Sequence, residues 1–68
     1  MPSVTAETVR DTLRKYVDAD DFHKLSWTER YNAEDTLLGL TTAIDANNAT
    51  EISIFLPLAL DILEVHIL

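Results

Sequence analysis

Residues 52–68, ISIFLPLALDILEVHIL, hold twelve apolar side chains and no positive charge. Wound as a helix, the segment places its polar residues and its proline on one arc of about 80°, since each residue advances by roughly 100°. The residues on this arc are Ser53, Pro57, Asp61 and Glu64. A helix that is apolar around most of its girth must be buried on more than one side. We therefore expect this segment to form the core of the domain and also a surface for assembly.

The chain has 68 residues, the size of one domain with a small core, because short chains bury a smaller fraction of their surface. It contains no cysteine, so neither disulfides nor thiolate metal ligands can reinforce that core. Oligomerisation is the remaining common source of stability at this size. One glycine and two prolines disfavour a many-turned β protein. We therefore predict an all-α fold, a three-helix bundle that forms a homodimer.

The first predicted helix covers about residues 5–17, with Thr5 as its N-cap. The connection that follows is expected to pack Phe22 and Leu25 against the core. Four of its polar residues could suggest a hard-metal site: Asp18, Asp20, Asp21 and His23. Their spacing does not match the twelve-residue calcium loop, which needs a glycine at the turn and a glutamate at its end. We interpret them as a solvated acidic loop and expect no metal and no cofactor.

The second predicted helix covers about residues 26–45. Ser26 and Glu29 have the spacing of a capping box, in which the serine accepts a hydrogen bond from the amide three residues later. Asn47 or Asn48 can end the helix in a left-handed conformation. The start and the end of this helix are therefore both predicted from local signals.

The third helix is predicted over about residues 49–67, with a kink at Pro57. An interior proline removes a backbone hydrogen bond and costs about 3 kcal/mol unless the helix bends. The alternative is an extended segment over Ile52–Leu56, followed by a helix with Pro57 in its first turn. The short connection to the second helix predicts an antiparallel hairpin, with the first helix packed across it.

The second helix carries two apolar stripes about 100° apart. One stripe is Ala33, Leu37, Leu40 and Ile44, and the other is Trp27, Tyr31 and Leu38. Two stripes predict two neighbours, one within the protomer and one across an interface. Glu34 lies between the stripes, where it can pair with Arg30 or fix the register of a partner. The predicted homodimer interface is Trp27, Tyr31, Leu38, Phe55, Leu56, Leu60, Leu63 and Ile67.

The net charge of −7 is unevenly distributed along the chain. Residues 31–68 carry no base and six acids: Glu34, Asp35, Asp45, Glu51, Asp61 and Glu64. An acidic surface repels nucleic acid and anionic membranes and attracts basic proteins. The C-terminal segment falls short of the roughly 20 apolar residues that span a bilayer. No secretory signal is visible, so we expect a cytoplasmic protein with no nucleic-acid or membrane partner.

Catalytic machinery is hard to find in this chain. It has no cysteine nucleophile, no serine with a base at a readable spacing, and only Gly39 from which to build a phosphate loop. We therefore expect a protein that is not an enzyme and whose acidic surface engages a basic protein, as an inhibitor, an immunity-type protein or a nucleic-acid mimic. The alternative is a small adaptor or chaperone dimer that holds a hydrophobic client segment. A third hypothesis is a metal-dependent enzyme that uses the acidic loop.

Overall fold

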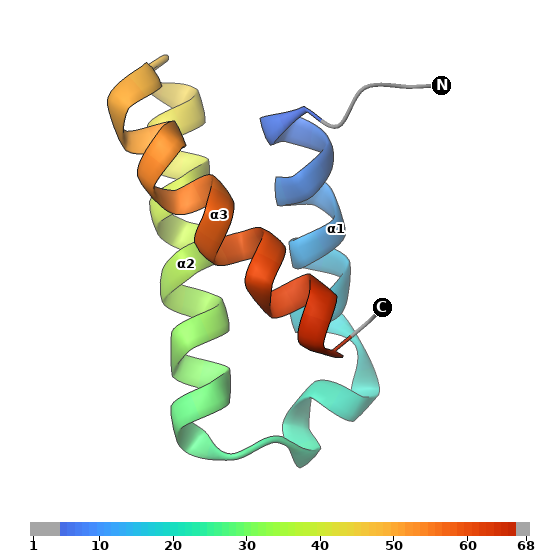
Figure 1. The fold of residues 1–68 in the computed structure, drawn as a ribbon. Helices are drawn as coiled ribbons and strands as arrows, with labels where there is room; N and C mark the ends of the chain where they lie inside the picture. The colour runs from blue at the N-terminus through green and yellow to red at the C-terminus, as the bar shows by residue number, and fades with distance from the viewer. Residues whose placement is uncertain (1–4, 67–68) are drawn as a thin grey trace.

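The computed structural model describes residues 5–66, with side chains from Thr5 to Glu64. This part of the chain contains three α helices, one short 3-10 helix and no strand, which confirms the all-α prediction. In chain order these elements are α1 Ala6–Asp18, η1 Asp20–Lys24, α2 Trp27–Asp45 and α3 Ala49–His66. Figure 1 shows α1 and α2 antiparallel and side by side, with α3 crossing both diagonally.

Helix α1 begins where its cap was predicted. The Thr5 hydroxyl oxygen accepts a hydrogen bond from the Thr8 N–H at 3.1 Å, which satisfies one of the free donors of the first turn. Two apolar side chains of the helix, Val9 and Leu13, are buried. The rest of α1 is mostly exposed and charged, so this helix contributes one narrow apolar face to the core.

The connection after α1 folds into the short helix η1. Phe22 is its buried residue, with 3% of its surface exposed, and its ring meets the Tyr16 ring edge-on at a centroid distance of 5.4 Å. Leu25 is half-buried against the same core. The prediction that these two apolar residues pin the connection to the core is therefore confirmed.

Both ends of α2 follow the predicted local signals. The Ser26 side-chain oxygen accepts from the Glu29 N–H at 3.2 Å, and its hydroxyl donates to the Glu29 carboxylate at 3.0 Å. At the other end Asn47 has φ 52°, the left-handed conformation that asparagine tolerates better than most residues. The Asn48 N–H donates to the Ala43 carbonyl and the Asn47 N–H to the Ile44 carbonyl, the bond pair of a Schellman motif.

Helix α3 starts at once after this turn. The Asn48 side-chain oxygen accepts from the Glu51 N–H at 3.1 Å and caps the new helix. The helix then continues through Pro57, which lies on its exposed side. Residues Ile52–Leu56 are therefore helical, and the extended alternative is wrong.

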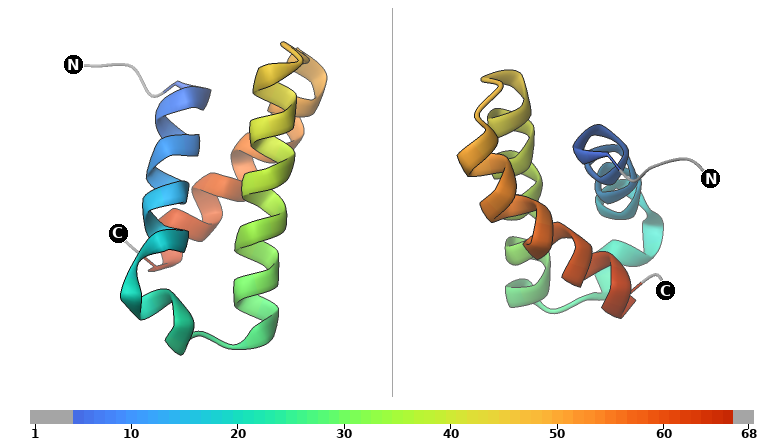
Figure 2. Two further views of the ribbon diagram at one scale, coloured as in Figure 1. Left: turned by 180° about the vertical axis from the view of Figure 1, so that it is seen from behind. Right: turned by 45° about the horizontal axis from the view of Figure 1, so that its top comes forward.

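The first half of α3 lies beside α2, and its second half crosses toward the end of α1 (Figure 2). The sequence predicted α1 across an α2–α3 hairpin, whereas α3 is the helix that crosses the other two. Small residues explain this path, because Gly39 allows the Phe55 ring to lie directly on the α2 backbone. Ala59 in the middle of α3 is completely buried, so the crossing is also close at that point.

The core lies where the three helices and η1 meet. Its two fully buried large side chains are Leu13 of α1 and Leu40 of α2. The other members of the buried cluster are Val9, Phe22, Ala33, Ala59, Ile62 and Leu63. One face of α3 thus fills the core of the fold, and its opposite face is exposed.

Candidate protein-interaction surface

The inward face of α2 is made mainly of small side chains. Ala33, Thr36 and Ala43 are buried there beside Leu40, and Gly39 contacts the Phe55 ring. The predicted inner stripe is confirmed in position, since Leu37 and Ile44 are half-buried against the same core. This narrow packing lets α1 and α3 approach α2 closely and turns the large side chains of the other stripe outward.

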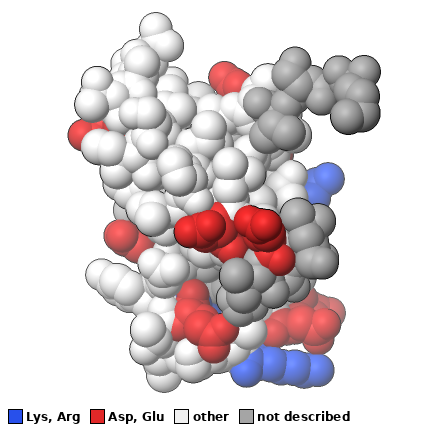
Figure 3. Space-filling view, in the orientation of Figure 1, with Lys and Arg blue, Asp and Glu red and all other residues white. Residues whose placement is uncertain are grey.

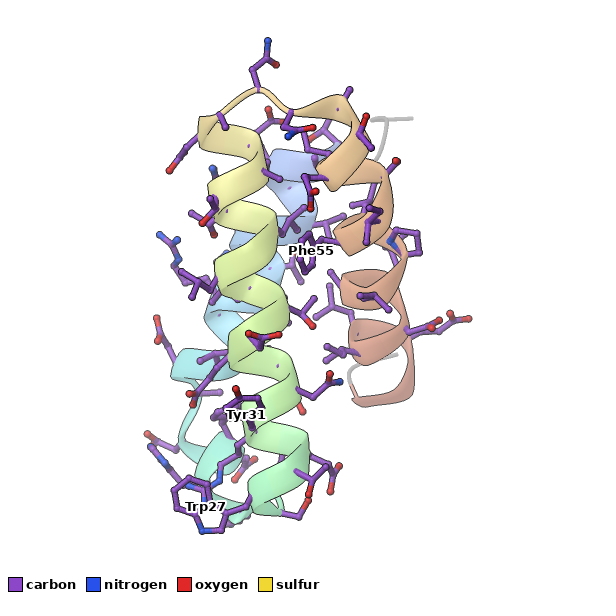
Figure 4. All side chains as sticks on the ribbon, turned by 90° about the vertical axis from the view of Figure 1, so that its left-hand side faces the viewer. Trp27, Tyr31 and Phe55 are labelled. Carbon is purple, nitrogen blue, oxygen red and sulfur yellow. The ribbon has the colours of Figure 1, made fainter. Side chains whose placement is uncertain are left out.

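The outward face of α2 carries the largest exposed apolar side chains in the described part of the protein. Trp27 is 79% exposed, Tyr31 is 71% exposed and Leu38 is 66% exposed. Figure 4 looks onto this face and shows Tyr31 in front of the α2 ribbon and Trp27 beside the start of the helix, with Phe55 between α2 and α3. The second apolar stripe therefore points away from the protomer, as its wheel position predicted.

Two carboxylates interrupt the stripe. Glu34 and Asp35 are exposed between Tyr31 and Leu38, and neither forms an ion pair with a described base. We call the five residues Trp27, Tyr31, Glu34, Asp35 and Leu38 the α2 surface. This surface combines apolar area with two negative charges that are still available to a partner.

Arg30 takes a different position from the predicted pair with Glu34. Its guanidinium carbon lies 4.7 Å from the centroid of the Trp27 ring, within the range of a cation–π contact. Arg30 is half-buried, whereas Trp27 remains 79% exposed despite this contact. The contact holds Trp27 against its own helix and leaves Glu34 without that cation.

Three shallow hollows follow one another along α2. The first is lined by Trp27, Thr28, Glu29, Tyr31, Asn32 and Asp35. The second, which we call the central hollow, is lined by Tyr31, Glu34, Asp35 and Leu38. The third is lined by Arg14 of α1 together with Glu34, Leu37, Leu38 and Thr41. The α2 surface is therefore indented at regular intervals rather than flat.

Helix α3 bears a second group of exposed apolar residues. Ile54 is 52% exposed, Leu58 is 46% exposed and Leu60 is 40% exposed. The predicted interface instead included Phe55, Leu56 and Leu63 besides Leu60. Leu63 is buried in the core, while Phe55 and Leu56 are half-buried against it, so these three serve the interior of the protomer. Ile67 lies outside the described residues.

Sequence reasoning missed Ile54 and Leu58. Helix α3 is apolar on nearly all sides, so its own pattern does not distinguish an inward leucine from an outward one. The signal for the orientation of α3 lies in α2. Gly39 has no side chain, so the Phe55 ring can pack against it, which makes Phe55 an inward residue. Ile54 and Leu58 then lie about 100° and 60° around the helix from Phe55, on one exposed flank.

All six predicted acidic residues are exposed. Glu34 and Asp35 meet at the central hollow, whereas Asp61 and Glu64 belong to the outer side of α3. Asp45 and Glu51 lie near the turn between the two helices. Figure 3 shows carboxylates as separate groups rather than one continuous patch, with lysine and arginine toward the edges of this face.

Tyr16 is the described group with a shifted pKa. Burial raises the pKa of Tyr16 above its usual value near 10, and the negative charge of Glu29 raises it further. Tyr16 is half-buried and packs against Phe22 at the edge of the core. It is therefore not part of the α2 surface.

The residues of the acidic connection do not converge. Asp18, Asp20, Asp21 and His23 are exposed, and Asp21 lies 3.3 Å from the Lys24 amine. Among the described residues, no group of three or more histidine, aspartate or glutamate side chains is placed to hold a metal ion. Within the same residues, none of the helices has the length and apolar character needed to cross a bilayer.

Comparison with known proteins does not place this chain in a family. No protein-family model matches the chain, and no curated protein or solved structure shows significant similarity to it.

Proposed function

We propose that this protein is a non-catalytic binding module that engages a basic segment of another protein through the α2 surface. The observation that carries the proposal is the exposure of Trp27, Tyr31 and Leu38 on one face of a single helix. Large aromatic side chains are enriched among the residues that dominate binding energy at protein interfaces. Burying them contributes about 25 cal/mol for each Å² of apolar surface removed from water, which offsets part of the entropy lost on association.

The sign of the charge narrows the class of partner. Glu34 and Asp35 lie within the apolar stripe, and the chain as a whole carries a net charge of −7. A basic partner gains attraction from this field both during approach and in the complex. Nucleic acid is disfavoured by the same field, because its phosphates are repelled. The roles that fit are those of an inhibitor, an immunity-type protein or a nucleic-acid mimic.

The test uses two double variants of the full chain. Tyr31→Ala with Leu38→Ala removes apolar area from the α2 surface, and Ile54→Ala with Leu58→Ala removes exposed apolar area from α3. Immobilised wild type and both variants are incubated with lysate of the cells that produce the protein. Retained proteins are then compared between about 0.05 M and 0.5 M salt, a range that shortens the screening length several-fold.

The expected result is a set of basic proteins that the α3 variant retains and the α2 variant loses. Their capture should also weaken as the salt concentration rises. Capture that is the same for the two variants, or that does not respond to salt, contradicts the proposal. Circular dichroism of both variants confirms that each remains helical.

A second candidate is the small adaptor dimer, favoured by the exposure of Ile54 and Leu58 on one flank of α3. A second copy packed on this flank would bury both and add stability to a small core. Light scattering at micromolar concentration tests this candidate. A dimer that Leu58→Ser dissociates supports it, and a folded monomer excludes it.

A further inference from the structure

The hollows along α2 share one construction. Each contains four α2 residues at positions i, i+3, i+4 and i+7. These quartets are 28, 31, 32 and 35, then 31, 34, 35 and 38, then 34, 37, 38 and 41. When two helices pack in the manner of a coiled coil, a side chain of one inserts into such a quartet on the other. The outward side of α2 thus has the series of hollows into which the side chains of a second helix can insert.

The central hollow has walls of two chemical kinds. The Tyr31 ring and the Leu38 side chain lie at its two ends along the helix, and the carboxylates of Glu34 and Asp35 lie across its middle. An arginine or a lysine matches both kinds of wall. Its aliphatic stem packs on apolar surface while its charged head reaches the carboxylates. A leucine in the same place would remove water from the carboxylates without replacing those hydrogen bonds.

The third hollow has a different charge. Arg14 of α1 lines it beside Glu34, so one positive and one negative group face the same space. The remaining lining is Leu37, Leu38 and Thr41. A hollow that already holds its own cation has little need of a base from outside, and an apolar side chain fits it better. Because the two hollows are offset by three residues, the partner must carry the basic and the apolar residue one turn apart.

We infer that the α2 surface binds one amphipathic helix of a different protein. That helix inserts an arginine or lysine into the central hollow and an apolar residue into the third hollow. This inference rests on the proposed function and adds the form of the partner and the position of its charge.

The α2 helix of a second copy of this chain does not supply the basic side chain that the central hollow requires. The α2 surface of that copy carries the same two acids, Glu34 and Asp35, so antiparallel pairing of two α2 helices at the central hollow would bring four carboxylates near the twofold axis. Like charges in apposition destabilise a contact and select against that pairing. Charge complementarity therefore assigns the surface to a basic helix from elsewhere.

The experiment uses three synthetic amphipathic helical peptides that differ at one central position, which carries arginine, leucine or glutamate. None contains tryptophan, so fluorescence of Trp27, the single tryptophan of the chain, reports binding at the α2 surface. The protein is tested as wild type and as Glu34→Arg. Asp61→Arg is the matched control, because it changes the net charge equally on α3.

Wild type should bind the arginine peptide about tenfold more tightly than the leucine peptide, and the glutamate peptide most weakly. Glu34→Arg should reverse the order of the arginine and glutamate peptides, and Asp61→Arg should preserve it. Equal binding of the arginine and glutamate peptides to wild type overturns the inference, as does the same preference in wild type and Glu34→Arg. If no peptide binds although lysate capture still depends on Tyr31 and Leu38, the helical partner is rejected and the proposed function stands.

Discussion

The two faces of α2 differ in how much of their surface comes from large side chains. The inward face is built mostly from Ala33, Thr36, Gly39 and Ala43, whereas the outward face presents Trp27, Tyr31 and Leu38 to solvent. Large apolar side chains normally contribute most to a core, since each buries the most surface. In this helix a small residue at Gly39 lets α3 approach closely, while Leu37, Leu40 and Ile44 also pack inward and three large residues stay exposed. Position around the helix, rather than size or hydrophobicity, therefore separates the inward face of α2 from the candidate binding face.

Leu38 and Leu40 provide the strongest contrast, because they are identical side chains two positions apart. Leu40 is fully buried and Leu38 is 66% exposed. We expect Leu40→Ala to lower the free energy of unfolding by about 2–5 kcal/mol, through lost burial and the cavity left behind. Leu38→Ala should change it by less than about 0.5 kcal/mol. Urea unfolding followed by circular dichroism measures both.

A loss of that size is a large part of the stability of a 68-residue domain, so Leu40→Ala should be partly unfolded at room temperature. Similar losses from the two substitutions would show that the outward face is already covered, for instance by a second copy. Repeating the measurement at two protein concentrations shows whether a second copy covers the face, because the stability of a dimer depends on protein concentration.

Gly39 tests how close the inward packing is. A Cβ at this position would overlap the Phe55 ring, so Gly39→Ala must displace that ring or the α3 backbone. We expect a net loss of about 1–2 kcal/mol, because the overpacking cost exceeds the gain of up to about 1 kcal/mol in helix propensity. Thermal unfolding of the variant measures the loss.

The second substitution Phe55→Leu provides the control. A smaller side chain makes room for the added methyl group, so the double variant should be more stable than the sum of the two single effects predicts. Strict additivity would contradict direct contact between Gly39 and Phe55. An increase in stability from Gly39→Ala alone would show that α3 yields easily at this point.

The same contrast explains how much of the structure could be predicted from the sequence. The caps at Thr5, Ser26 and Asn47 were predictable because each depends on a few neighbouring residues and on one hydrogen-bond pattern. The two stripes of α2 were predictable because polar residues separate them on the helix. Both kinds of signal are local to one element.

The orientation of α3 was not predictable in that way. Its apolar residues surround most of the helix, so Leu63 and Leu58 look alike in the sequence although one is buried and the other is exposed. The choice depends on the shape of another helix, at Gly39, and on the path that α3 takes across α1. The partner of Arg30 was not predictable for a similar reason. Trp27 and Glu34 are both about one helical turn from Arg30, and its long side chain can reach either.

Tyr16 offers the smallest effect, visible only at high pH. Burial and the charge of Glu29 raise the pKa of this half-buried tyrosine, so the folded state holds the phenol proton more tightly than the unfolded state does. The free energy of unfolding should therefore not depend on this group below about pH 10, and should fall as the pH rises further, since the unfolded chain then releases the proton first. Tyr16→Phe removes the group, and its unfolding free energy should fall less steeply above that pH than that of wild type. Parallel pH profiles for the two proteins would contradict the packing of Tyr16 against the core, and with it the contrast between a half-buried Tyr16 and an exposed Tyr31.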